Sequence, residues 1–211
     1  MAKQLIVAIR ITVILLLLVS GVYPLVVWGI SQAAFHYQAN GSLITNASGQ
    51  VVGSALLAQG FTKPEYFHPR PSAAGSGYDP TQSSGTNLGP TSDKLINGIH
   101  KKLPNGKDDP TKFDGVKDLA AAYRTDNGLP AGAPVPVDAV TRSASGLDPD
   151  ISPANAALQA ARVAKARGLS ADALRPLVTA STHGRALGML GEPGVNVLAL
   201  NVALDKQYPK R

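Results

Sequence analysis

The longest apolar run in the chain covers residues 11–30, where no Asp, Glu, Lys or Arg occurs and thirteen of the twenty residues are Ile, Leu or Val. At about 1.5 Å per residue, a helix of this length spans about 30 Å, the thickness of a bilayer's hydrocarbon core. The aliphatic residues alone favour insertion by about 5 kcal/mol. We therefore predict a transmembrane helix over residues 11–32. Ser20, Gly21 and Pro24 fall within it, and small residues let a neighbouring helix approach, so we expect this stretch to pack against a partner.

The charges that flank the apolar run predict its orientation. Lys3 and Arg10 precede it, and the next charged residue is Lys63. Because the basic flank stays in the cytoplasm, residues 1–10 are expected inside and residues 33–211 outside a plasma (inner) membrane. The alternative is a signal peptide cleaved after Ser31-Gln32-Ala33. An apolar region longer than the ~7–15 residues typical of signal peptides favours the retained anchor.

The patterns beyond the anchor alternate between short strands and helices. Residues 42–45 and 50–57 flank Asn46-Ala47-Ser48-Gly49, which predicts a hairpin. Apolar spacing predicts helices after Ser92 to His100 and over about residues 114–123, and a short strand over residues 135–141.

The best-defined helix of the exported part is predicted over Pro153–Arg167. Ser152 is placed as its N-cap and Gly168 just beyond its end. Ser170 should cap another helix, which Pro176 is expected to kink or shorten. Residues 195–204 fit both helix and strand periods. The fold class we predict is one N-terminal transmembrane helix followed by a single extracytoplasmic α+β domain.

Residues 61–90 form a long stretch with five prolines, four glycines and four aromatic residues. Pro and Gly make a regular element improbable, whereas the aromatic residues favour an ordered, packed loop. Arg70 lies between Pro69 and Pro71, so its backbone is stiff. It is a candidate for a bidentate contact with a partner, or alternatively for tying the loop to its own domain. The candidate docking residues are Phe61, Tyr66, Phe67, Arg70 and Tyr78.

Composition removes several classes of function. Of 20 basic and 14 acidic residues, two basic ones precede the anchor, so the exported part carries a net charge of 18 − 14 = +4. This charge is scattered, and we expect no nucleic-acid partner. Cysteine is absent, which excludes disulfides, thiolate metal sites and cysteine nucleophiles. The four histidines are too dispersed for a helical metal motif, so we expect no metal site.

Candidate chemistry is sparse in this sequence. Residues 141–152 are rich in hydroxyl groups and lead into the helix at Pro153, so they could bind an anion or merely cap the helix. The candidate nucleotide-related residues are Ser143, Ser145, Gly146, Gln159 and Arg162. No catalytic residue is assigned. Two alternatives stay open: a free-standing extracytoplasmic binding protein, and an anchored envelope serine hydrolase, whose candidate residues would be Ser145 or Ser72 with His68 or His183.

A set of ordered motifs resembles the C subunit of the Kdp potassium-transporting ATPase. They run through most of the chain, and the stretch 103–134 departs most from the family's pattern. The matching segments are Gly21-Val22-Tyr23-Pro24-Leu25, Gln38-Ala39-Asn40-Gly41-Ser42-Leu43, Gly53-Ser54-Ala55-Leu56, Gln59, Phe61, Tyr66-Phe67, Arg70-Pro71-Ser72, Ser84-Gly85, Asn87-Leu88-Gly89, Val140-Thr141, Ser143-Ala144-Ser145-Gly146-Leu147-Asp148, Ile151-Ser152-Pro153, Gln159, Arg162-Val163-Ala164-Lys165-Ala166-Arg167, Val195-Asn196-Val197, Asn201 and Ala203-Leu204-Asp205.

The resemblance implies a non-catalytic accessory subunit of an ATP-driven potassium uptake complex. Its implied partners are a channel-like potassium-binding subunit, a P-type ATPase subunit, a small membrane peptide and the lipid bilayer. It implies that this subunit stabilises assembly, and a role in promoting ATP binding has been proposed for the family, which makes ATP a candidate cofactor. That role conflicts with the predicted topology, because a domain outside the membrane does not meet cytoplasmic ATP. The domain could instead dock over the outer mouth of the channel-like subunit.

Overall fold

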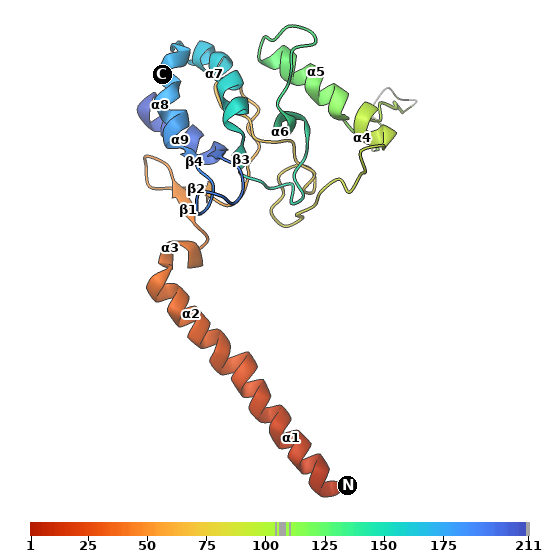
Figure 1. Ribbon diagram of the computed structural model, residues 1–211, viewed down its shortest axis with the longest axis vertical. Coiled ribbons are helices and arrows are strands. Elements are labelled where there is room, and N and C mark those ends of the chain that lie inside the picture. Colours follow the sequence, from red (N-terminus) through yellow and green to blue (C-terminus); the bar gives the residue numbers. More distant parts are fainter. Residues whose placement is uncertain (104, 106–108, 110, 210–211) are drawn as a thin grey trace. The chain divides into compact units, whose positions relative to one another are not determined.

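A computed structural model of the chain describes residues 1–103, 105, 109 and 111–209 (Figure 1). The chain forms two compact units, Met1–Leu43 and Ile44–Arg211.

The first unit is dominated by a continuous apolar helix, Ala2–Ala34, which is long and apolar enough to cross a membrane. It consists of α1 (Ala2–Leu17), a π-helical turn η1 (Leu18–Val22) and α2 (Tyr23–Ala34). The short helix α3 (His36–Ala39) follows. Pro24 explains the widened turn, because proline lacks an N–H and its ring crowds the carbonyl four residues earlier, that of Ser20. The helix is longer than the predicted span at both ends.

The second unit opens with the predicted hairpin. Strands β1 (Leu43–Thr45) and β2 (Val51–Ser54) pair in a two-stranded sheet. The turn between them is held by Asn46, whose side-chain oxygen accepts hydrogen bonds from the backbone N–H groups of Ser48 and Gln50. An Asn side chain that replaces a backbone partner in this way favours a tight turn.

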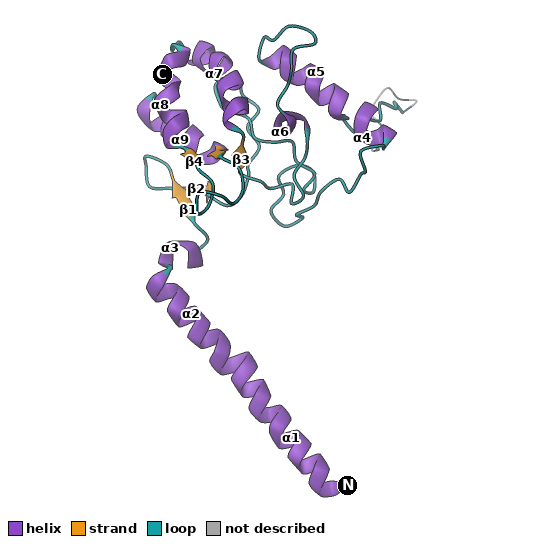
Figure 2. Ribbon diagram, viewed as in Figure 1, coloured by secondary structure: helices purple, strands orange, loops and turns teal. Residues whose placement is uncertain are grey.

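Residues 61–90 form the predicted ordered loop, all of it described. Figure 2 shows no helix or strand between β2 and α4 (Asp93–Asn97), yet Phe67 in this loop is fully buried. The next elements are α5 (Val116–Asp126) and α6 (Val137–Val140). The loop therefore contributes to the core without contributing a regular element.

A three-stranded antiparallel sheet and three helices form the C-terminal part of the unit (Figure 1). The sheet has the order β3-β5-β4, with Ile151 and Thr182 both opposite Val195. Its strands and the helices are β3 (Asp150–Ile151), α7 (Pro153–Arg167), α8 (Ala171–Ala180), β4 (Thr182–His183), β5 (Gly194–Asn196) and α9 (Val197–Gln207).

The main hydrophobic core lies among these C-terminal elements and receives Phe67 from the loop. Burying such side chains is the principal stabilising contribution to a fold of this kind. The fully or almost fully buried members are Phe67, Ile151, Ala156, Val163, Ala164, Leu174, Leu177, Val195, Val197, Leu200 and Leu204.

Local capping residues explain why the helices begin and end where they do. The Ser152 hydroxyl accepts from the backbone N–H of Asn155, and Gly168 ends α7 in the left-handed conformation, as predicted. The predicted caps Ser92 and Ser170 also accept hydrogen bonds at the starts of α4 and α8. Pro176 lies inside α8, which continues to Ala180.

The structure contradicts one sequence-based prediction and resolves one run that the sequence left ambiguous. The strand predicted over residues 135–141 is wrong, because Val137–Val140 forms the helical turn α6. The Asp138 carboxylate in this turn accepts hydrogen bonds from Ser152 and Asn155, so a tertiary contact overrides the alternating pattern. The ambiguous run 195–204 divides into the end of β5 and most of α9. The strand period therefore applies to its first two residues and the helix period to the rest.

Candidate functional site

Two buried amide side chains join the 61–90 loop to the helices. Asn201 on α9 accepts from the backbone N–H of Phe67 and donates to its carbonyl, both at 2.9 Å. Gln159 on α7 does the same for His68, at 2.7 and 3.0 Å. Both side chains are almost fully buried. Each amide thus makes the hydrogen bonds to a residue's backbone N–H and C=O that a neighbouring strand would make. The irregular loop can therefore enter the core without leaving these backbone groups unpaired.

The amides belong to a larger polar network behind the loop. Gln159 donates to the side-chain oxygen of Asn155, which also accepts from the hydroxyl of Tyr123, both at 2.9 Å. Asn155 in turn donates to Asp138 at 2.9 Å. Burial raises the pKa of Tyr123 to about 12, so its hydroxyl remains a donor at neutral pH. The network links α5, α6 and α7 to the loop.

Two arginines hold the carbonyl groups of the loop. Arg162 donates to the carbonyls of Pro64 and Tyr66, at 2.6 and 2.9 Å, and to the side-chain oxygen of Gln159 at 2.7 Å. Arg167 donates to the carbonyl of Glu65 at 2.8 Å and to the carboxylate of Asp205 at 2.7 Å. The planar guanidinium group suits this use, because it presents several donors in fixed directions.

His68 is shielded by the same arrangement. Burial, with the nearby Arg162 guanidinium as a second cause, lowers the pKa of His68 below its usual value. Its Nε2 lies 3.0 Å from the carbonyl oxygen of Lys63. The ring is therefore neutral at neutral pH and donates within the loop.

The second half of the loop is fastened to residues 141–148. Arg70 donates to the carboxylate of Asp148 at 2.7 Å, with side chains 23% and 30% exposed. Ser72 donates to the carbonyl of Gly146 at 2.6 Å. Gly146 adopts φ +68°, and a Cβ there would lie 2.5 Å from the carbonyl oxygen of Ser84, so a residue with a side chain would not fit.

The five candidate docking residues fall into different environments. Phe61 and Tyr66 line a cleft of about 460 Å³ that the turn after β1 and helix α9 also border. Phe67 is fully buried in the core and anchors the loop there. The hydroxyl of Tyr78 donates to the carbonyl of Arg70 at 2.8 Å, and burial raises the pKa of Tyr78 to about 12. Arg70 combines a tie to its own domain with partial exposure.

The candidate nucleotide-related residues separate into a surface set and an interior set. Ser143 and Ser145 border a shallow hollow that Arg70 and Arg142 also line. Gly146 receives the hydrogen bond of Ser72, whereas Gln159 and Arg162 are engaged with the loop. In the first unit, the candidate packing residues Ser20 and Gly21 lie in the π-helical turn, and Pro24 lies directly after it.

The serine hydrolase alternative has no nucleophile and base pair among the described residues. The Ser72 hydroxyl donates to a carbonyl and accepts from the N–H groups of Ala74 and Tyr78. Ser145 accepts from the N–H of Leu147, and His183 pairs with Asp150. A catalytic Ser and His need a mutual hydrogen bond, and neither serine has one to a histidine in this part of the chain.

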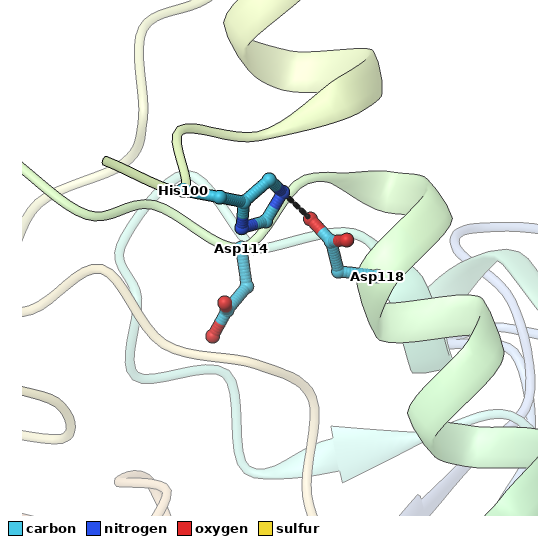
Figure 3. Close-up of side chains that lie close together, drawn as sticks. All are labelled: His100, Asp114 and Asp118. Carbon is cyan, nitrogen blue, oxygen red and sulfur yellow. Dashed lines mark ion pairs between the residues drawn. The ribbon is translucent and has the colours of Figure 1, made fainter. Parts of the chain in front are cut away.

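His100, Asp114 and Asp118 form a group with ligand-type atoms within 4.8 Å of one another (Figure 3). Nε2 of His100 lies 3.0 Å from the carbonyl oxygen of Asn97 and 3.1 Å from the Asp118 carboxylate, so contacts within the domain already engage this nitrogen. The same Asp118 oxygen accepts from the N–H of Gly115 at 2.8 Å. These contacts join the end of α4 to the start of α5.

Comparison with known proteins decides the family. The family model described as KdpC, K+-transporting ATPase, c chain, matches residues 5–206. The chain belongs to the KdpC family. Relatives named potassium-transporting ATPase KdpC subunit include those of Caulobacter vibrioides strain NA1000, 54% identical over 89% of this chain and 85% of that protein, and Koribacter versatilis, 47% identical over 99% and 97%. The Mycobacterium tuberculosis strain H37Ra relative is 48% identical over 98% of this chain and 100% of its own length.

KdpC membership agrees with the resemblance found in the sequence, and the structure shows what several of the quoted residues do. Gln159, Arg162 and Asn201 bind loop backbone, and Arg70 and Ser72 fasten the loop to residues 146–148. The buried amides Asn155 and Asn201 were missed as network residues. The available signal was an amide among apolar neighbours on a helix, as in Leu200-Asn201-Val202.

Proposed function

We propose that this chain is a non-catalytic accessory subunit that stabilises assembly of the potassium-transporting ATPase. Its partners would be a channel-like potassium-binding subunit, a P-type ATPase subunit and a small membrane peptide. The helix Ala2–Ala34 would span the plasma (inner) membrane through residues 11–32, with residues 1–10 in the cytoplasm and the domain from residue 33 outside. The charges of Lys3 and Arg10 support this orientation.

The observation that carries this proposal is the use of the family's motif residues. They bind backbone groups of the 61–90 loop and so fix its shape, as a docking surface requires. A preorganised surface loses less conformational entropy on binding than a mobile one. Phe61, Tyr66, Arg70 and Tyr78 would form the docking face, with Phe67 holding it from below.

Promotion of ATP binding has less support than assembly. Two of its five candidate residues, Gln159 and Arg162, are committed to the loop, and Gly146 carries the hydrogen bond of Ser72. Ser143 and Ser145 remain at the surface beside Arg142, whose guanidinium stacks on Phe113 at 4.3 Å and donates to the carbonyl of Asp114. The predicted topology also places these residues away from cytoplasmic ATP.

A pair of substitutions tests whether Arg70 contacts a partner. Arg70→Ala and Asp148→Asn both break the ion pair within the domain, and only the former removes the guanidinium. We expect Arg70→Ala to reduce co-purification of the transporter's other chains several-fold more than Asp148→Asn does, because a bidentate contact to a carboxylate would also be lost. Equal co-purification for both variants would assign Arg70 to its own domain alone.

A further inference from the structure

The loop between β4 and β5 exposes apolar side chains to an unusual degree. Leu187, Met189 and Leu190 are 87%, 72% and 58% exposed, all within four consecutive residues. Among the large apolar residues that the structure describes, only Met1 is more exposed than Leu187. Isolated exposed apolar residues are ordinary, whereas a cluster marks an interaction site. We call Leu187–Leu190 the apolar tip.

Backbone hydrogen bonds close the turn that forms the apolar tip. The backbone groups of Ala186 and Leu190 exchange two hydrogen bonds, of 2.8 and 2.9 Å, and the N–H of Gly188 donates to the carbonyl of Arg185 at 3.1 Å. Leu187 adopts φ +54°, a conformation that costs free energy for any residue with a side chain. A polar turn built on Gly or Asn would avoid both this cost and the exposure of leucine.

The base of the loop is pinned by two ion pairs. Arg185 donates to both carboxylate oxygens of Glu192, at 2.8 and 2.7 Å. In the adjoining sheet, His183 on β4 lies 2.8 Å from the carboxylate of Asp150 on β3. This contact passes over the central strand β5 at Gly194. A Cβ at Gly194 would lie 2.7 Å from the His183 ring, so the closeness of the pair depends on glycine there. The apolar tip thus projects from a braced stem.

The chemistry of the loop favours a protein pocket over a lipid surface. Residues 184–193 contain no aromatic residue and only two charged ones, Arg185 and Glu192, which neutralise each other. Segments that settle in a bilayer interface combine apolar residues with Lys or Arg that face the anionic headgroups, and the one basic residue of this loop is already paired with Glu192. The apolar tip projects outward and its loop has no net charge. The surface that complements it is a concave apolar pocket with an uncharged rim.

We propose that the apolar tip inserts into such a pocket on the extracytoplasmic side of a membrane-embedded chain of the transporter. This inference rests on the proposed function, which supplies the partner. Eight residues separate the end of the anchor at Ala34 from β1, and this short tether would raise the effective concentration of the apolar tip at the membrane-embedded chains. The strained turn and the exposed leucines are then explained by their burial in the assembled transporter.

The chain contains no cysteine, so a single introduced one can be labelled in the full-length protein. Met189→Cys reports on the apolar tip, and Val137→Cys is the matched control because both native side chains are 72% exposed. An environment-sensitive fluorophore at each position is compared in the co-purified transporter and in the chain alone in nanodiscs containing anionic lipid. We expect a blue shift and at least tenfold slower iodide quenching at position 189 in the transporter only, with position 137 unchanged throughout.

Unlabelled variants provide the second measurement. Leu187→Ser with Leu190→Ser should lower co-purification of the other chains at least tenfold, and Val137→Ser should leave it unchanged. A label at position 189 that stays solvent-exposed in the transporter, or that shifts equally in nanodiscs without partners, overturns the pocket. Intact co-purification of the double variant overturns it as well. Each of these results refutes only the apolar tip, provided that the unmodified chain still co-purifies with the transporter's other chains. If the unmodified chain does not co-purify with them, the proposed function fails, and this inference fails with it.

Discussion

Asn201 and Gln159 show how single side chains give shape to a segment that has no regular structure. Each amide pairs with the backbone N–H and C=O of one loop residue, Phe67 in the core or the partly buried His68. Because the two loop residues are consecutive and their partners lie on different helices, the loop is fixed against α7 and α9 at once. Both amides are engaged by loop backbone, so what they determine is the geometry of the loop.

Replacing Asn201 with Ala should destabilise the fold strongly. The N–H and C=O of Phe67 would both be buried without partners, at roughly 1–3 kcal/mol each, so we expect a loss of about 3 kcal/mol in the free energy of unfolding. Urea unfolding of the full chain in detergent measures it. Asn97→Ala removes an exposed amide on α4 and should cost less than about 1 kcal/mol. Equal losses in the two variants would contradict the role assigned to Asn201.

His183 should make stability depend on pH. Its hydrogen bond to Asp150 raises the pKa of His183 above its usual value, so the folded state holds the proton more tightly than the unfolded one. This stabilisation is complete below the unfolded pKa of about 6.5 and is lost as the pH rises through the higher folded pKa. The side chain is half exposed, which limits the effect to about 1 kcal/mol. Unfolding of wild type and His183→Ala should therefore differ more at about pH 6 than at about pH 9; a constant or growing difference would refute the pairing.

The elements that could be predicted from sequence are those with local signals. Helix α7 begins and ends at the predicted residues because Ser152, Pro153 and Gly168 act within one turn of its ends. The turn α6 was mistaken for a strand because its conformation depends on Asp138 binding residues fourteen or more positions away. The loop's order was predictable from its aromatic residues, whereas its attachment to Asn201, more than 130 residues distant, was not.

We propose that a partner helix approaches the apolar helix at its π-helical turn, which contains Ser20 and Gly21. A Cβ added at Gly21 in this turn, or at Gly29 in α2, would have no other atom of the chain within 4 Å, so a side chain fits at both. Gly21→Leu should nevertheless reduce co-purification of the partner chains several-fold, because small residues permit close helix contact. Gly29→Leu, the matched control, should have little effect. Equal behaviour of the two variants would remove Ser20 and Gly21 from the interface.

At the scale of the whole molecule, the chain has an apolar helix suited to a membrane and a domain whose polar network shapes the 61–90 loop, the proposed docking surface. Of the candidate site, the position of the loop and the tie of Arg70 to its own domain were anticipated in the sequence, the latter as an alternative. The division of the docking residues between cleft, core and surface could not be predicted, because it depends on which helices the loop meets. The apolar tip also escaped notice, since Leu and Met near β-prone residues look like core until their exposure is measured.

The amount of intact transporter recovered with and without this chain measures its role in assembly. The other subunits are expressed at matched levels, extracted in mild detergent and separated by size. We predict that omitting the chain lowers the recovered complex at least tenfold and that the full-length chain restores it. Recovery of an intact, fully active complex in its absence would contradict the account.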